Sequence, residues 1–169
     1  ELMNALRRKF GSVGGKETEF LAYVKKECES IANNFLENDI SITTTLWLVE
    51  SFVRQKFELD EILKEAKLEY ENPGIVEGVK AGSKGFGWLP ETNPYRLPEG
   101  LNEDEKAGQK LFWETYAKAC QIIVKELSEK GVKIMAGTDA NLPLTVPGFS
   151  LHDELISLNQ AGISTSQIF

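Results

Sequence analysis

The first half of the chain changes its hydrophobic period from helical to extended and back to helical. From Glu17 to Asn38, apolar residues recur every three or four positions, at Phe20, Val24, Cys28, Ile31 and Phe35. This spacing predicts an amphipathic helix with charged residues on its other face. The segment 39–48 is rich in β-branched residues and nearly free of charge, and it predicts a strand buried on both faces. We expect helices from about Val49 and again from Leu59 to Tyr70, with Asn72-Pro73-Gly74 ending the second of them.

The second half starts with a long irregular segment and returns to regular structure near residue 102. Residues 72–101 are rich in glycine and proline, which is typical of a lid, a binding loop or a disordered segment. Asn102 and Glu105 form a capping-box pattern, and the apolar spacing behind them predicts a helix that ends near Gly131. The short apolar run at 132–137 is the second predicted strand.

The last forty residues predict one more helix and the start of another. Ser150 and Asp153 resemble a helix N-cap, and a helix is expected to end at Gly162. Its inner face is predicted to consist of leucines, at Leu151, Leu155 and Leu158. Ser164 and Gln167 repeat a helix-start pattern close to the last residue, and we interpret this pattern as a sign that the chain belongs to a longer protein.

This order of elements predicts an α/β fold with parallel strands, because long helical segments separate the two strands. A parallel sheet needs cover on both faces, and two strands leave two open edges. We therefore expect further strands outside this sequence. Without them, the open edges and apolar helix faces predict that the chain self-associates.

Composition narrows the possible partners. The chain has 169 residues, 41% of them hydrophobic, which suits one domain with a real core. Its net charge of −7 argues against nucleic acid and anionic membranes as main partners. No apolar run approaches the ~20 residues of a membrane span. Cys28 and Cys120 are expected to be buried free thiols rather than a disulfide, and the compartment stays open between cytoplasm and periplasm.

Common catalytic motifs fail on spacing. The glycines at 11–15 do not match a phosphate-binding loop, because Phe10 occupies the required first glycine position. The glycine-rich stretch 78–87 lacks both a preceding strand and the dinucleotide-binding register. His152 is the only histidine, so neither a zinc site nor a Ser-His-Asp triad is well supported by this chain alone.

The segment 131–164 carries the most specific pattern. An apolar strand ends in Gly137-Thr138-Asp139, a loop with two prolines follows, and a helix containing His-x-Glu-Leu leads to Ala-Gly-Ile-Ser. This order resembles the eighth-strand region of the metal-dependent amidohydrolase superfamily, most of all the group that includes imidazolonepropionase and prolidase-like hydrolases. The segment 40–48 looks like the preceding barrel strand, although Thr44-Thr45-Leu46 stands where the family often has Pro-Thr-Leu.

The resemblance implies a fold and an activity. Members of this superfamily are (β/α)8 barrels of the TIM type, with the active site at the carboxyl ends of the strands. Residues 1–169 would be a partial amidohydrolase domain, the C-terminal fragment of such a barrel, with a helical insert at about 49–130. The parent protein would hydrolyse C–N bonds in small amide, cyclic-amide or dipeptide-like substrates. The other metal-binding positions of the family cannot be located, so the fragment alone is expected to be inactive.

The resemblance also implies roles for individual residues. Asp139 would bind a divalent metal, expected to be zinc, and would take a proton from metal-bound water. That metal belongs to the parent enzyme, and this chain alone is not expected to hold it. Taken by itself, Asp139 also suits a turn after a strand. His152 is a candidate for substrate binding, and it also suits a local hydrogen bond within its helix.

A function from another class stays open. The chain would then be a helical protein-interaction module without catalysis, with the segment from Trp88 to Tyr95 as its binding surface. The same aromatic residues also suit a substrate lid or anchors in the core. The environment of Asp139 separates the two classes, because a hydrolase needs this carboxylate in a concave polar site.

Overall fold

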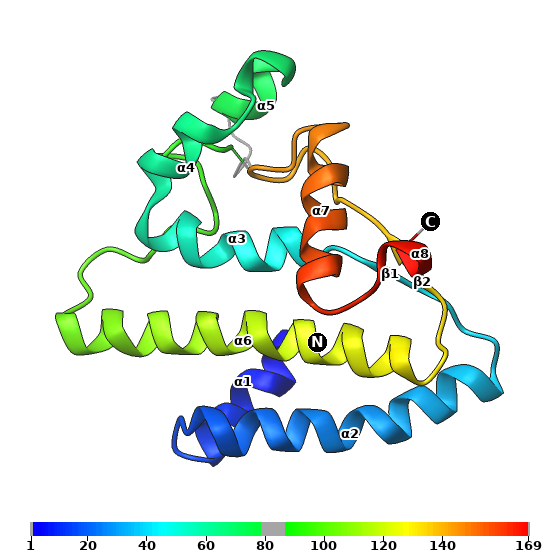
Figure 1. The fold of residues 1–169 in the computed structure, drawn as a ribbon. Coiled ribbons are helices and arrows are strands. Elements are labelled where there is room, and N and C mark those ends of the chain that lie inside the picture. Colours follow the sequence, from blue (N-terminus) through cyan, green and yellow to red (C-terminus); the bar gives the residue numbers. More distant parts are fainter. Residues whose placement is uncertain (1, 79–86, 169) are drawn as a thin grey trace.

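The computed structural model describes residues 2–78 and 87–168, and within them helices cover one face of a pair of short parallel strands. Helices α2 and α6 lie side by side, α1 packs against both of them, and α3 and α7 pack together on the other side of α6 (Figure 1). The elements are α1 (Leu2–Ser12), α2 (Glu17–Glu37), β1 (Ile42–Thr44), α3 (Leu46–Phe57), α4 (Leu59–Glu65), a 3₁₀ turn (Leu68–Tyr70), α5 (Pro73–Glu77), α6 (Glu103–Glu129), β2 (Ile134–Ala136), α7 (Phe149–Gln160) and α8 (Thr165–Ile168). The predicted helix-rich α/β class with two parallel strands is confirmed.

The first strand is shorter than its sequence pattern suggests. The pattern predicts a strand over 39–48, but β1 covers Ile42–Thr44 and α3 already begins at Leu46. Asp39 turns the chain with a φ of 49° just before the strand. The apolar run is therefore divided between a strand and the first turn of a helix, and the helical segment between the strands starts earlier than residue 49.

The two faces of the strand pair have different surroundings. Ile42 pairs with Ile134, and Thr44 pairs with Ala136 in parallel register. Ile42 and Ile134 pack against buried residues of α2 and α6, which covers this face with helices. On the opposite face, Thr43 pairs with Met135, and both side chains are exposed. The strand predicted to be buried on both faces is thus buried on one face only.

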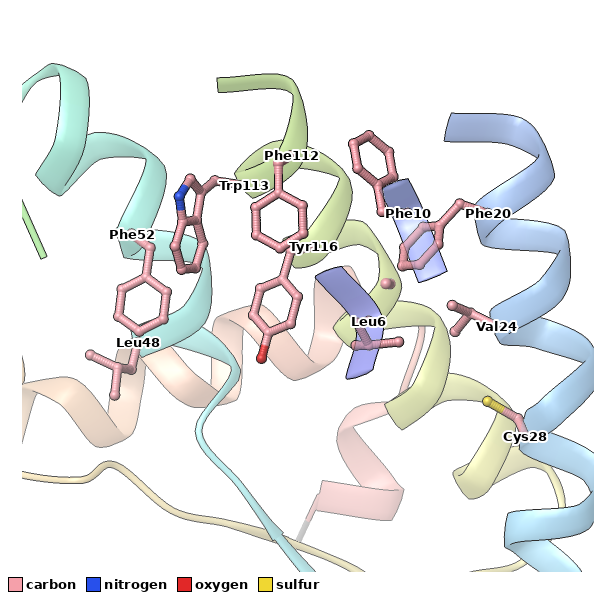
Figure 2. Packing of buried hydrophobic residues seen from close by; sticks show 11 residues of the cluster. Leu6, Phe10, Phe20, Val24, Cys28, Leu48, Phe52, Phe112, Trp113 and Tyr116 are labelled. Carbon is pink, nitrogen blue, oxygen red and sulfur yellow. The ribbon is translucent and has the colours of Figure 1, made fainter. Parts of the chain in front are cut away.

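An aromatic core joins the long helices to α1 and α3. Figure 2 shows side chains of all four helices meeting around Phe10 and Phe112, whose ring centroids lie 5.7 Å apart.

The predicted capping box of α6 is present. The Asn102 side chain accepts a hydrogen bond from the Glu105 N–H, and the Glu105 side chain accepts one from the Asn102 N–H. Cys28 is buried in this core, Cys120 is partly buried beside it, and both are free thiols as expected. No helix of the described ranges is long and apolar enough to cross a bilayer.

Three local expectations are corrected by the backbone. The helix predicted from Leu59 to Tyr70 breaks at Ala66, which is extended. Asn72 does not end a helix but begins α5, because its side chain accepts a hydrogen bond from the Gly74 N–H at 2.8 Å. Helix α7 begins at Phe149 without a side-chain cap, and the Ser150 hydroxyl instead donates to the Val146 carbonyl.

The irregular segment is anchored by a buried tryptophan. Trp88 has an exposed fraction of 0% and packs with Ile62 and Val146. Trp88 therefore anchors the segment in the core. Because it is buried, Trp88 itself cannot form part of a binding surface. Asn93 continues the anchoring, because its amide donates to the buried Gln55 side chain at 2.9 Å. Most of the glycine-rich stretch 78–87 lies outside the described residues.

Candidate functional site

The loop that follows β2 is held in an unusual backbone conformation. Non-glycine residues with positive φ occur at Asp139 (48°), Asn141 (76°) and Leu144 (71°). Positive φ is rare for a leucine, and such strain persists only where the surroundings fix the conformation. Thr145, fully buried, provides this restraint by donating its hydroxyl to the carbonyls of Asp139 at 2.8 Å and Leu142 at 2.6 Å. Strained segments of this kind cluster at functional sites.

Asp139 stands at the beginning of this loop, three residues beyond the last residue of β2. Its carbonyl accepts the two hydrogen bonds from Thr145 and from the Leu142 N–H, so its main chain forms part of a turn. Its side chain is exposed, at the carboxyl end of the strand pair and outside the lining of the pocket described below. Within the described residues Asp139 therefore takes the turn position that its sequence also suited, and not the concave polar site that a hydrolase needs. Partial burial of the phenol and, to a lesser degree, the charge of Asp139 raise the pKa of Tyr95.

A metal centre does not form from the described residues alone. No three side chains of His, Cys, Asp or Glu type within 2–78 and 87–168 lie close enough together to hold a metal ion. Zinc requires three or four such ligands. Asp139 supplies one carboxylate, so the described residues do not fit a complete metal site.

Glu154 is a fully buried carboxylate that binds the start of α3. One oxygen accepts from the Thr44 hydroxyl at 2.6 Å, and the other accepts from the Trp47 N–H at 2.7 Å. Thr45, the N-cap residue of α3, makes no side-chain cap of its own. Glu154 therefore takes over the capping function from a distant helix, and it fixes the carboxyl end of β1 relative to α7.

The inner face of α7 is more polar than the predicted leucine face. Ser150, Glu154 and Ser157 are buried, whereas Leu151 is exposed. Leu158 is buried as predicted, and Leu155 is half-buried. The spacing of 150, 154 and 157 is itself a helical stripe, and this pattern of polar residues was the signal in the sequence that could have identified Glu154.

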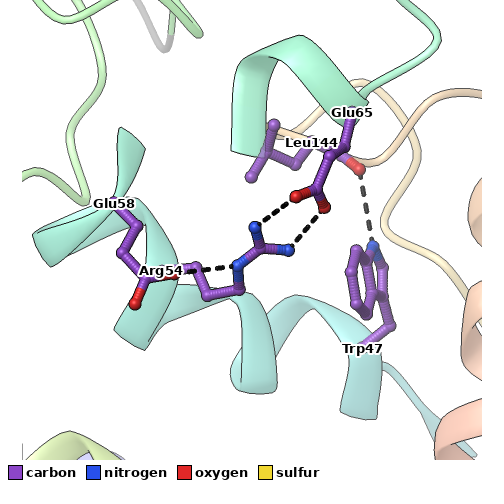
Figure 3. Close-up of polar contacts among 5 residues, drawn as sticks. All are labelled: Trp47, Arg54, Glu58, Glu65 and Leu144. Atoms are coloured by element: carbon purple, nitrogen blue, oxygen red, sulfur yellow. Dashed lines mark hydrogen bonds and ion pairs between the residues drawn. The ribbon is translucent and has the colours of Figure 1, made fainter. Parts of the chain in front are cut away.

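A pocket of about 250 Å³ lies between α3, α4 and α7. It is lined by Trp47, Ile62, Glu65, Ala66, Lys67, Leu144, Val146, Phe149, His152 and Asp153. Figure 3 shows Trp47 pointing its indole N–H toward the Leu144 carbonyl, 3.5 Å away, with the Arg54–Glu65 pair above it. The carboxyl ends of both strands lead into this region, because Trp47 follows β1 and Leu144 follows β2.

The two residues singled out by sequence do not meet in this pocket. His152 lines it, while Asp139 does not. Asp153 lines it as well, and partial burial raises the pKa of its carboxyl group, an effect that the charge of His152 partly offsets. Sequence reasoning used Asp153 only as a helix-start signal, and no spacing rule connects it to Trp47, more than 100 residues earlier.

The chain matches no protein-family model, no curated protein and no solved structure. Function must therefore be argued from the residues and their arrangement.

Proposed function

We propose that this chain supplies the last two strands and the catalytic carboxylate Asp139 of a metal-dependent hydrolase that cleaves C–N bonds. The observation that carries the proposal is the position of Asp139, which follows the carboxyl end of a strand in a parallel pair. Barrel enzymes place their catalytic residues at these strand ends.

The environment of the strand pair supports this placement. Helices cover the face that carries Ile42 and Ile134, and the face that carries Thr43 and Met135 is exposed. In a (β/α)8 barrel, each strand has helices outside and other strands inside. The exposed face is therefore the one that would turn toward the barrel interior, with the missing strands closing around it.

The chemistry assigned to Asp139 is proton transfer. An exposed carboxylate at a rigid strand end can accept a proton from an attacking water and return it to the leaving amine. The remaining metal ligands have to come from sequence outside the described residues, because these residues do not form a complete site. Small amides, cyclic amides and dipeptide-like molecules are the proposed substrates.

The decisive experiment replaces Asp139 in the full-length protein that contains this chain. Asp139→Asn suits the test because asparagine tolerates a φ of 48° and the aspartate side chain receives no hydrogen bond from the described residues. Hydrolysis of a panel of dipeptides, N-acyl amino acids and cyclic amides should fall in kcat by about 10²- to 10⁴-fold. Asp104→Asn, at an exposed position in the first turn of α6, is the matched control. Undiminished activity of Asp139→Asn would refute the proposal.

Metal analysis of the 169-residue chain gives a second test. The purified chain of 18.9 kDa should contain no stoichiometric zinc, because residues 2–78 and 87–168 bring too few ligands together. Stoichiometric zinc on this chain would mean that ligands come from several copies, and the assignment of the metal site to a larger barrel would fail.

The alternative proposal is a helical interaction module. Trp88 is buried and Tyr95 is half-buried against Phe52, so the aromatic segment gives this alternative little support. Its main support is the exposed apolar side chains of α7 at Phe149, Leu151 and Ile156. Under this alternative, Asp139→Asn has no effect on any hydrolytic activity, while Ile156→Lys abolishes binding of a partner.

A further inference from the structure

The pocket between α3, α4 and α7 is not used by the proposed hydrolysis, because Asp139 does not line it. Its volume of about 250 Å³ lies just below the range of roughly 300–1,000 Å³ found for drug-sized ligands. It therefore suits a molecule with one ring and a short substituent.

The floor of the pocket is apolar and rigid. Ile62, Leu144 and Val146 are buried in one hydrophobic cluster together with Trp88. Leu144 is held in its positive-φ conformation by the restrained loop after β2. A floor of this kind keeps its shape without a ligand, so little ordering cost opposes binding.

Two aromatic side chains line the pocket above this floor. Trp47 is fixed through its main chain, because its N–H donates to the buried Glu154. Phe149 is 38% exposed, and its ring packs against Tyr70 with centroids 4.9 Å apart. An aromatic face that stays accessible next to an apolar floor favours flat rings and positively charged groups.

The charged side chains at the rim differ in whether another residue already neutralises their charge. Glu65 accepts two hydrogen bonds from Arg54, each 2.7 Å long, so its charge is neutralised (Figure 3). Lys67 and His152 are exposed to solvent. Asp153 is partly buried, and its carboxylate accepts no hydrogen bond from any residue in the described ranges.

We propose that this pocket binds a small molecule that carries one aromatic ring and a basic nitrogen, with the ring against Trp47 and Phe149 and the nitrogen donating to Asp153. A partly buried carboxylate without a donor gains most from a cation, because a charge-assisted hydrogen bond replaces lost solvation. An anionic ligand is disfavoured, since the lining residue Lys67 is exposed and screened by solvent, and attracts an anion less than the partly buried Asp153 repels it.

The test compares three probes of similar shape on the 169-residue chain. Benzylamine, benzyl alcohol and benzoate are titrated separately while amide and indole N–H signals are followed by NMR. Benzylamine should shift the Trp47 indole signal and bind about ten-fold more tightly than benzyl alcohol, because only the amine forms the charged hydrogen bond. Benzoate should be the weakest of the three. Equal affinities for the amine and the alcohol, shifts confined to another surface, or no saturable shift would overturn the proposal.

Two variants locate the interaction. Asp153→Asn should remove the roughly ten-fold preference for benzylamine over benzyl alcohol. Phe149→Leu should lower the affinity for both of these probes. Asp104→Asn, on the exposed first turn of α6, controls for the loss of one carboxylate and should bind as wild type does. Retained preference in a folded Asp153→Asn variant would contradict the assignment. Asp139→Asn should leave benzylamine binding unchanged, so this inference and the proposed hydrolysis fail or succeed separately.

Discussion

Glu154 in α7 caps the N-terminus of α3 by accepting a hydrogen bond from the Trp47 N–H at 2.7 Å, across 107 positions of sequence. The same carboxylate accepts from the Thr44 hydroxyl at the end of β1. One buried side chain therefore joins a strand end, a helix start and a distant helix. It also holds Trp47 at the wall of the ligand pocket.

Replacing Glu154 should destabilise the fold. Glu154→Leu removes both acceptor oxygens at similar side-chain size, so the Trp47 N–H loses its partner in a buried site, while the Thr44 hydroxyl keeps the Met135 carbonyl as an acceptor. An unsatisfied buried polar group costs about 1–3 kcal/mol, and chemical denaturation should show a decrease of that size in the free energy of unfolding. Glu91→Leu, at an exposed loop position, is the control and should be nearly neutral. A Glu154→Leu variant as stable as wild type would disprove the capping role.

Gly137 is required where β2 meets the end of β1. A Cβ atom at this position would lie 2.5 Å from the Thr43 Cγ2 atom and 2.8 Å from the Thr44 carbonyl oxygen. Gly137→Ala should therefore lower the free energy of unfolding by about 1–3 kcal/mol, as overpacking does elsewhere. Gly108→Ala in α6 meets no atom within 4 Å and should instead raise it by about 0.5–1 kcal/mol. Thermal or urea unfolding should show that Gly137→Ala lowers the free energy of unfolding and that Gly108→Ala raises it.

Lys56 should make stability depend on pH in the alkaline range. Burial, together with the charge of Arg7, lowers the pKa of its amine to about 8 from the ordinary value of 10.5. Between pH 8 and 10.5, the unfolded chain holds a proton that the folded chain has released. The free energy of unfolding of wild type should therefore increase with pH across this window, relative to Lys56→Met.

Urea titrations of both proteins at several pH values measure this difference. After losing its proton, the Lys56 amine can still donate to the Tyr95 carbonyl, from which it lies 2.5 Å away. Its contact with the segment that Trp88 and Asn93 anchor is therefore kept. Lys64→Met, in α4, controls for the removal of an exposed amine. A wild-type to Lys56→Met difference that stays flat or falls from pH 8 to 10.5 would contradict the expected effect of burial.

The uncovered face of the strand pair should drive self-association of the chain. Met135 is 49% exposed on this face, next to Thr43, and each strand has an open edge within the described residues. Sedimentation velocity should show a mass that rises with concentration, and Met135→Lys should shift the chain toward monomer. Leu111→Lys, at an exposed apolar position on α6, is the control. A monomer at all concentrations, or an equal effect of the control, would refute this role for the sheet face.

Local sequence rules predicted the long elements well. The apolar spacing of α2 and the Asn102–Glu105 capping box of α6 depend on residues within a few positions of one another, so they could be read without the fold. The same rules were wrong at 39–48. There, helix formation from Leu46 depends on Glu154 accepting a hydrogen bond from the Trp47 N–H, and no local pattern contains this distant cap.

The candidate site could be predicted only in part. Asp139 and His152 were identified by a sequence pattern, but that pattern does not reveal that His152 lines a pocket and Asp139 does not. Asp153, Trp47 and Phe149 were missed as a group, because they come together only when α7 packs against α3.

The sequence by itself determined that α2 and α6 are long helices, that two apolar runs contain parallel strands, and that Asp139 follows the second of them. These features depend on hydrophobic period, capping and turn residues, which act over a few positions. The tertiary structure decided that the buried face of α7 is polar, that Trp88 is a core anchor, and that a pocket forms at Asp153. The physical reason is that burial and hydrogen-bond partners are set by segments far apart in the chain, and Glu154 is buried because Thr44 and Trp47 satisfy both of its oxygens.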